Sequence, residues 1–177
     1  RLSPVTIDSS TALSPLTTSS LKLLITGTIS VIIGQIIHLI SAGYLVKKEI
    51  LITAGPYKYV RNPFYVGNFF TDFGLGLMSC NIYATLAYML FFYTFIIPNR
   101  VKKEERMLFE KHKEKYTEYC NTVPRFIPKL FSKMKALNGS FQKEILYKHK
   151  EIPRVFRILS IAALFFIVSA LKSNKIK

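Results

Sequence analysis

Two short segments contain most of the side chains that could perform chemistry. The first, LITAGPYKYVRNPFYVG, covers residues 51–67 and combines two cations and three tyrosines with two prolines and two glycines. The second covers residues 100–128 and begins with an arginine, Arg100, that is followed by a pair of glutamates. A guanidinium can hold a carboxylate substrate through two parallel hydrogen bonds. An amine substrate would instead need a base, for which Glu105 and His112 are the nearby candidates.

The prolines and glycines of the first segment predict a structured connector. Pro56 and Pro63 each prevent a continuous helix, so residues 53–63 should form a fixed turn at a membrane surface. Gly55 and Gly67 permit close approach of the backbone to its neighbours. The tyrosines also suit a membrane interface, where the ring lies among lipid headgroups and the hydroxyl stays hydrated. The segment is therefore either an aromatic anchor or a binding site, and its density of special residues favours a site.

The second segment has the periodicity of an amphipathic cytoplasmic helix over residues 100–122, which ends before Pro124. At about 100° per residue, its apolar stripe contains Val101, Leu108, Phe109, His112, Tyr116 and Tyr119. Glu105 falls in the middle of this stripe, where a carboxylate is costly unless a cation or a hydrogen-bond donor meets it. Glu104 lies at the edge of the stripe, and by periodicity alone it is a solvated surface charge.

Long apolar runs predict an all-α, polytopic helical membrane protein with about four transmembrane helices. Residues 21–45 contain almost no charge and are long enough to cross a hydrocarbon core of about 30 Å as a helix. Two shorter runs, 64–80 and 82–98, predict a helical hairpin with its turn at Asn81. Residues 155–171 are a fourth candidate, which could either span the bilayer or lie along its interface.

Composition divides the chain into three parts. Residues 1–20 are rich in Ser, Thr and Pro, residues 21–128 form the membrane core, and residues 129–177 combine a basic linker with a C-terminal hydrophobic helix. Because the chain does not begin with Met, we expect an upstream piece to be missing. The formal net charge is +15 and many of the cations follow Pro98, so the positive-inside rule places this region and the connector on the cytoplasmic face.

The same composition argues against metal and nucleic-acid chemistry. Cys80 and Cys120 have no partner at the spacing of a metal site, and the histidines are scattered. A cationic face on a membrane protein is explained by its attraction to anionic lipid headgroups. Gly74 and Gly76 lie inside an apolar run and not between a strand and a helix, so they form no dinucleotide-binding loop. We therefore expect no metal and no nucleic acid as partners.

Taken in order, the motifs of both segments resemble those of a known family of membrane enzymes. They are Gly55-Pro56-Tyr57, the run RNPFYVG at 61–67, a membrane hairpin, Arg100 with Glu104-Glu105, the pair Tyr116 and Tyr119, and the closing run VPRFIP at 123–128. This order and spacing, over about residues 49–128, are similar to those of the isoprenylcysteine carboxyl methyltransferase and phospholipid methyltransferase group.

The resemblance implies a cofactor, an acceptor and a set of site residues. In that family the connector and the glutamate helix hold S-adenosylmethionine at the cytoplasmic surface, while the lipid of the acceptor enters from the bilayer. The implied catalytic residues are Arg100, which would meet the acceptor, and Glu105. The implied cofactor-binding residues are Glu49, Ile50, Leu51, Ile52, Tyr57, Asn62, Pro63, Phe64, Tyr65 and Glu104. The expected acceptor is the carboxylate of an isoprenylcysteine-like lipid or lipidated protein, in a bacterial inner membrane or the endoplasmic reticulum.

One position departs from the family pattern, because Asn62 stands where the prototype has histidine. Asparagine can still form hydrogen bonds, but it cannot carry a charge or act as a base. Any proton transfer at this position is therefore in doubt. A carboxylate acceptor is already ionised at neutral pH and needs no base.

Three other functions remain compatible with the sequence. A phospholipid N-methyltransferase would share the fold and the cofactor but would first have to deprotonate its amine. A membrane sterol-type reductase has a distantly similar connector and binds NADPH. Glu104 and Glu105 would repel the 2′-phosphate of NADPH, whereas Lys102 and Lys103 would attract it. Asn62 also leaves room for a non-catalytic membrane scaffold.

Overall fold

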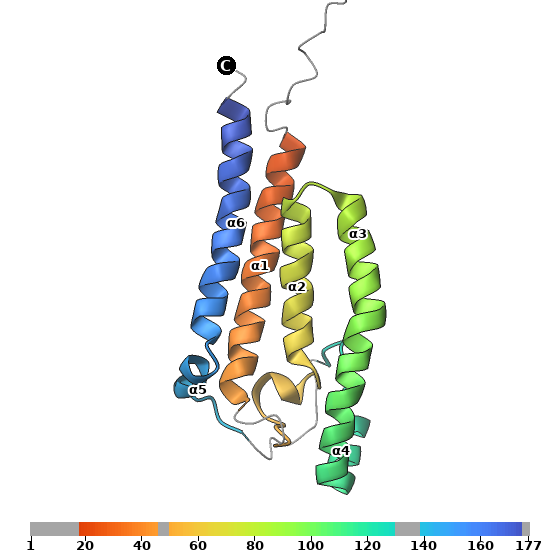
Figure 1. The fold of residues 1–177 in the computed structure, drawn as a ribbon. Coiled ribbons are helices and arrows are strands. Elements are labelled where there is room, and N and C mark those ends of the chain that lie inside the picture. Colours follow the sequence, from red (N-terminus) through yellow and green to blue (C-terminus); the bar gives the residue numbers. More distant parts are fainter. Residues whose placement is uncertain (1–17, 46–49, 130–138, 175–177) are drawn as a thin grey trace, which may run out of the picture.

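The computed structural model describes residues 18–45, 50–129 and 139–174, and this part of the chain is built from helices (Figure 1). The elements are α1 (Thr18–Tyr44), η2 (Gly55–Lys58), α2 (Pro63–Met78), α3 (Ile82–Phe91), η3 (Phe92–Ile96), α4 (Ile97–Thr122), α5 (Lys143–Lys148) and α6 (Glu151–Asn174). α2 lies between α1 and α3, and α6 lies along the other side of α1 (Figure 1). The all-α fold expected from the sequence is confirmed.

Within the part of the chain that the structure describes, three helical stretches are long and apolar enough to cross a membrane, namely Ser19–Tyr44, Ile82–Thr122 and Glu151–Ser169. The last of these overlaps the fourth candidate segment of the sequence, residues 155–171, and it belongs to α6, which lies alongside α1 (Figure 1). α2 has 16 residues, which at about 1.5 Å each reach about 24 Å and fall short of a core of about 30 Å. The structure therefore has three candidate spans where the sequence predicts about four.

The turn between α2 and α3 lies where the sequence predicts it. α2 ends at Met78, and Cys80 takes a positive φ of 56°, which a helix cannot continue through. The side chain of Asn81 then caps α3 by accepting a hydrogen bond from the backbone N–H of Ala84 at 3.0 Å. This cap confirms Asn81 as the turn of the hairpin.

Glycines allow α1 and α2 to pack in close contact. Gly27 and Gly34 on α1 face Gly74 and Gly67 on α2, and a Cβ added at Gly34 would lie only 2.6 Å from the carbonyl oxygen of Gly67. Small residues of this kind let membrane helices approach until their backbones touch. The side-chain amide of Gln35 donates to the hydroxyl of Thr71 at 2.8 Å beside this contact. The close approach expected at Gly67 is therefore confirmed.

Replacing Gly34 with alanine should lower the free energy of unfolding by about 2 kcal/mol, because the added methyl group overpacks the contact between α1 and α2. Denaturant titration of the detergent-solubilised protein measures this loss. Thr26→Ala is the control, since Thr26 lies on the exposed side of α1, and it should change stability by less than about 0.5 kcal/mol. A Gly34→Ala variant as stable as this control would contradict the close contact.

α3 continues through η3 into α4 without a break, although the sequence predicts separate helices on either side of Pro98. A π-helical turn, Phe92–Ile96, precedes the proline, and the backbone N–H of Ile97 bonds to the carbonyl oxygen of Phe92. Pro98 has no N–H to donate, and the side-chain amide of Asn99 donates to the carbonyl oxygen of Phe95 at 2.8 Å. The wider turn accommodates the proline ring, so α3, η3 and α4 form one continuous helical path.

α4 contains a kink that a periodicity argument cannot foresee. Lys113 has φ 41° and ψ −109°, so the helix changes direction there. Tyr116 and Tyr119 beyond the kink are buried against Leu51, whereas Phe109 before it is 52% exposed. The predicted placement of Phe109 on the buried stripe is wrong, because the stripe assumes an unbroken helix.

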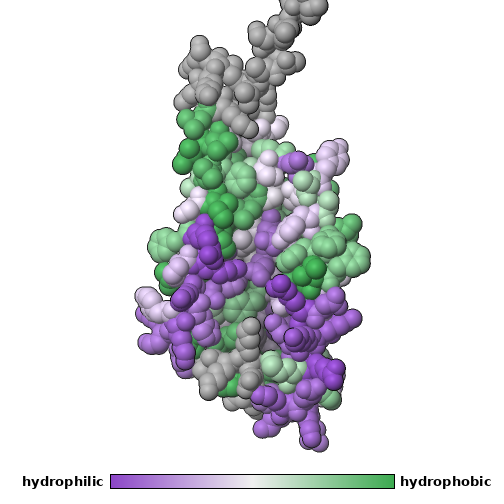
Figure 2. Space-filling view, in the orientation of Figure 1, coloured by the Kyte–Doolittle hydropathy of each residue, from purple (hydrophilic) through white to green (hydrophobic). Residues whose placement is uncertain are grey.

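Hydropathy divides the molecule along its length. Hydrophilic residues gather over α4 and α5, while the upper parts of the helices carry mainly hydrophobic residues (Figure 2). α3 exposes large apolar side chains, including Tyr83 and Leu90, as expected for a surface that contacts lipid. The site described below lies at the hydrophilic end.

Candidate functional site

One cavity of about 1010 Å³ brings the two chemistry-bearing segments together. Its wall includes all of the sequence-predicted site residues that the structure describes, namely Ile50, Leu51, Ile52, Tyr57, Asn62, Pro63, Phe64, Tyr65, Arg100, Glu104 and Glu105. Glu49 lies outside the described residues. Side chains from two separate segments of the sequence thus face one space, at the end of the bundle where α2 begins.

The connector is held rigidly by buried contacts. Gly55 has a φ of +58°, and this left-handed conformation opens the single turn of η2. Tyr57 is buried; its hydroxyl donates to the carbonyl oxygen of Ser41 at 3.4 Å, and its own carbonyl oxygen accepts from the hydroxyl of Tyr119 at 2.6 Å. Burial raises the pKa of Tyr57 well above its ordinary value, so the phenol stays a neutral donor. Tyr57 is therefore part of a packed core and not a headgroup anchor.

A phenol–carboxylate contact lies between the two segments. Pro63 occupies the first turn of α2, where its missing N–H costs nothing, and this places Tyr65 facing α4. The hydroxyl of Tyr65 donates to Oε1 of Glu104 at 3.2 Å. Arg100 lies one turn before Glu104 on α4, also lines the cavity, and is exposed. A carboxylate, a phenol and a guanidinium thus share one wall.

Glu105 is bound by two arginines from other parts of the chain. Its Oε1 lies 3.3 Å from Nη1 of Arg61 and accepts from Nε of Arg125 at 3.0 Å, and its side chain is only 12% exposed. The backbone N–H of Arg61 also donates to the carbonyl oxygen of Pro124 at 2.8 Å. The expectation that a cation meets Glu105 is confirmed. Its carboxylate links α4, the connector and residues 123–128, the closing segment. We call this three-part contact the clamp.

The clamp changes the assignment of a base. Both carboxylate oxygens of Glu105 contact guanidinium groups, so its position is that of a structural tie between segments and not of a free base facing a substrate. His112, the other base candidate from the sequence, does not line the cavity. Asn62 lines it but donates its side-chain amide to the carbonyl oxygen of Arg125 at 3.3 Å, which ties the start of α2 to the closing segment.

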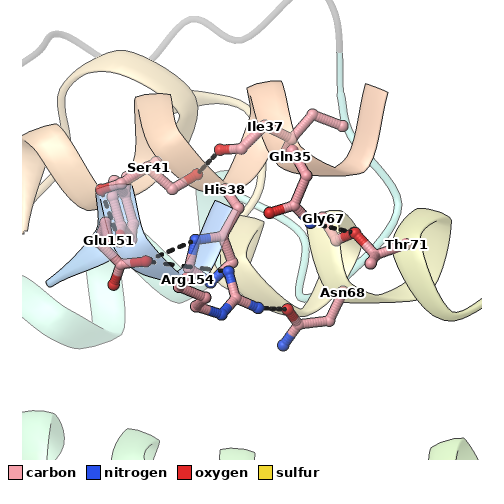
Figure 3. Close-up of polar contacts among 10 residues, drawn as sticks. Gln35, Ile37, His38, Ser41, Gly67, Asn68, Thr71, Glu151 and Arg154 are labelled. Atoms are coloured by element: carbon pink, nitrogen blue, oxygen red, sulfur yellow. Dashed lines mark hydrogen bonds and ion pairs between the residues drawn. The ribbon is translucent and has the colours of Figure 1, made fainter. Parts of the chain in front are cut away.

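The C-terminal part of the chain supplies a side of the cavity that the sequence does not predict (Figure 3). Nδ1 of His38 on α1 lies 3.3 Å from Oε2 of Glu151 on α6. Nη2 of Arg154 on α6 donates to the side-chain carbonyl of Asn68 on α2 at 2.9 Å. Three helices therefore meet in one polar cluster. The only signal in the sequence is that His38 interrupts one apolar run and that Arg154 directly precedes another.

Comparison with known proteins gives a family for part of the chain. The model of the isoprenylcysteine carboxyl methyltransferase (ICMT) family matches residues 24–110. This range contains most of α1, the connector, α2, α3 and the first half of α4, and it therefore includes Arg100, Glu104 and Glu105. No solved structure matches the chain.

Curated proteins match the same region. Protein-S-isoprenylcysteine O-methyltransferase of Schizosaccharomyces pombe is 35% identical over 54% of this chain and 40% of its own length. The human protein of that name is 31% identical over 59% of this chain and 40% of its own length. Cobalt-zinc-cadmium resistance protein CzcN of Cupriavidus metallidurans is 34% identical over 48% of this chain and 38% of its own length. The chain thus spans about two fifths of these relatives. The family match and these relatives show that this region of the chain is similar to the isoprenylcysteine carboxyl methyltransferase family.

Proposed function

We propose that this protein transfers a methyl group from S-adenosylmethionine to a lipid or lipidated acceptor, and that the acceptor group is the carboxylate of an isoprenylcysteine-like substrate. The observation that carries the proposal is the convergence of the connector and the Arg100–Glu105 turn on one cavity. The relatives named protein-S-isoprenylcysteine O-methyltransferase support methyl transfer as the reaction. The apolar helices that carry residues of the cavity wall support a lipid acceptor.

The residues of the cavity fit the proposed cofactor. Part of the wall is apolar and aromatic and could contact the flat adenine ring of the cofactor; it consists of Leu51, Leu108, Tyr116 and Tyr119. Glu104, oriented by Tyr65, offers carboxylate oxygens to hydroxyl or ammonium donors. The volume of about 1010 Å³ lies at the upper end of the range of about 300–1,000 Å³ for small-molecule sites, so the cavity also has room for part of an acceptor.

The bound cofactor would supply a methyl group already activated on a sulfonium. What remains for the protein is to align the acceptor and to exclude water, which can contribute several kcal/mol to the rate. Arg100 would hold the acceptor carboxylate with its planar fork. Because that carboxylate is already ionised, the reaction needs no base, which agrees with Asn62 in place of a histidine and with the ion-paired state of Glu105.

The position of the cavity supports entry of the cofactor from water and of the acceptor from the lipid bilayer. It lies at the end of the bundle that carries the hydrophilic surfaces of α4 and α5, where a water-soluble cofactor can enter (Figure 2). The cations on α4 support a cytoplasmic location for this end of the bundle, by the positive-inside rule. The lipid chain of an acceptor would lie along the membrane helices.

The decisive experiment is calorimetric titration of the detergent-solubilised protein with S-adenosylhomocysteine and, separately, with NADPH. The methyltransferase proposal expects binding of S-adenosylhomocysteine alone. Binding of NADPH alone would overturn it in favour of a reductase. Binding of neither would favour a non-catalytic scaffold.

Replacing Tyr65 with phenylalanine should weaken S-adenosylhomocysteine binding about 10-fold, because Glu104 loses the donor that orients it. The melting temperature should change little, since the ring remains. Tyr59→Phe is the matched control: Tyr59 belongs to the same connector but is 40% exposed and does not line the cavity, so its affinity should stay that of the wild type. Equal affinity in both variants would count against a cofactor role for Tyr65.

A further inference from the structure

We propose that Arg154 forms a second anion-binding position in this cavity, which takes a carboxylate or phosphate oxygen carried on a lipid chain. The position is distinct from Arg100, since it is supplied by α6, which lies beyond the region of the family match. The inference rests on the proposed function in one respect only, namely that a lipid occupies the cavity.

The geometry of the cluster leaves part of the guanidinium available. Nη2 of Arg154 is bound by Asn68 at 2.9 Å, whereas Nη1 lies 3.9 Å from Oε2 of Glu151 (Figure 3). That distance permits attraction between the charges but is too long for a hydrogen bond. Within the described residues, Nη1 is buried and has no hydrogen-bond partner. A buried N–H without an acceptor is costly, and a ligand oxygen would remove that cost.

The local charge also favours an anion. Glu151 provides the nearby carboxylate, and it is shared between Arg154 and His38, whose Nδ1 lies 3.3 Å from the same Oε2. Lys148 and His149, at the end of α5, line the cavity beside Arg154. Arg154 also interacts through its charge with Asp72 and with Arg157. With Lys148 included, three cations therefore oppose two carboxylates in this part of the protein, and an incoming oxyanion would be attracted.

The position of Arg154 in the fold indicates a lipid and not a free ion. Arg154 lies in the first turn of α6, at the hydrophilic end of a candidate membrane span. Exposed apolar side chains follow on the same face of α6, including Ile161 and Val168, seven and fourteen residues after Arg154. An amphiphile whose head reaches Arg154 can therefore lay its chain along α6. Asn68 and Glu151 would act as positioning residues that hold the guanidinium in place.

The test measures binding of four probes to the full chain in a non-ionic detergent. Hexadecyl phosphate and hexadecanoate carry an oxyanion, hexadecanol has the same chain without a charge, and inorganic phosphate has the charge without a chain. Both anionic amphiphiles should bind the wild type at least about 10-fold more tightly than hexadecanol or inorganic phosphate do. The tighter of the two identifies the head group. Inorganic phosphate that binds as tightly as hexadecyl phosphate would overturn the lipid assignment.

Arg154→Gln should weaken binding of the preferred anionic amphiphile by roughly 10- to 100-fold, and leave hexadecanol unaffected. Arg157→Gln is the matched control, because it removes the same charge from the same helix at an exposed residue that does not line the cavity. Equal affinity in the two variants would overturn the proposal. Should the glutamine variant fail to fold, Arg154→Lys decides: it keeps the attraction to Glu151 but loses the fork, so about 10-fold weaker binding is expected and wild-type affinity would refute the role.

The failure of this inference can be told apart from that of the proposed function. S-adenosylhomocysteine titration of the wild type tests the cofactor proposal without reference to Arg154. Anion binding that depends on Arg154 in a protein that does not bind S-adenosylhomocysteine would refute methyl transfer and uphold the second position. The reverse result would uphold methyl transfer and refute the second position.

Discussion

Replacing Glu105 with glutamine should lower the free energy of unfolding by about 3 kcal/mol and reduce methyl transfer strongly. The carboxylate is nearly buried and balances Arg61, whose side chain is only 15% exposed. Removing one partner of such a pair leaves a charge without compensation, which typically costs about 3–5 kcal/mol. We expect the lower end, because Arg125 is more exposed and water screens its charge. Denaturant unfolding in detergent and methyl incorporation from labelled S-adenosylmethionine measure the two effects.

Glu110→Gln provides the comparison for Glu105. Glu110 also pairs with an arginine on α4, Arg106, at 2.9 Å, but both side chains are mainly exposed, and the change should have little effect on stability or activity. A Glu105→Gln variant that is more stable than the wild type and fully active would show that the carboxylate is only a burial penalty. The clamp between α4, the connector and the closing segment would then contribute to neither stability nor activity.

Arg100→Lys should lower kcat/KM for a prenylcysteine analogue by about 100-fold. A lysine keeps the charge but replaces the planar fork with a point charge, and hydrogen bonds to charged groups contribute roughly 1.5–3 kcal/mol. Arg106→Lys is the control, since Arg106 is on the same helix but does not line the cavity, and it should retain wild-type activity. A mild loss at Arg100, similar to that of the control, would remove the reason to expect a carboxylate acceptor.

The pH dependence of the wild-type rate separates the two methyltransferase alternatives. The pKa of a free α-carboxyl is about 3.5, so a carboxylate acceptor is fully ionised and its rate should be flat between about pH 6.5 and 9. An aminophospholipid must lose a proton first, so its rate should rise with pH over the same range. Methyl incorporation into both acceptors measures this. A steep rise on the phospholipid alone would refute carboxyl methylation and leave the fold and cofactor proposals intact.

Local sequence accounts for the features of this protein that depend on a few neighbouring residues. Pro56 and Pro63 interrupt the helix, and Asn81 caps α3, because backbone geometry and capping act within one or two turns. Glu105 requires a cation because an unpaired carboxylate is costly on any buried face. The order of the motifs also predicts that the site residues come from two segments, the connector and α4. These features could be predicted without a fold.

Tertiary structure alone decided which helices close the cavity and where α4 changes direction. His38 and Glu151 are 113 positions apart, and nothing in either apolar run specifies that α6 packs on the side of α1 that carries His38. The kink at Lys113 places a non-glycine residue at positive φ, against its local preference, and packing of Tyr116 and Tyr119 on Leu51 accompanies it. Periodicity predicts one face of one straight helix, whereas the free energy of packing depends on which faces meet. That is why the connector and the glutamates could be read from the sequence, while Arg154 and its cluster could not.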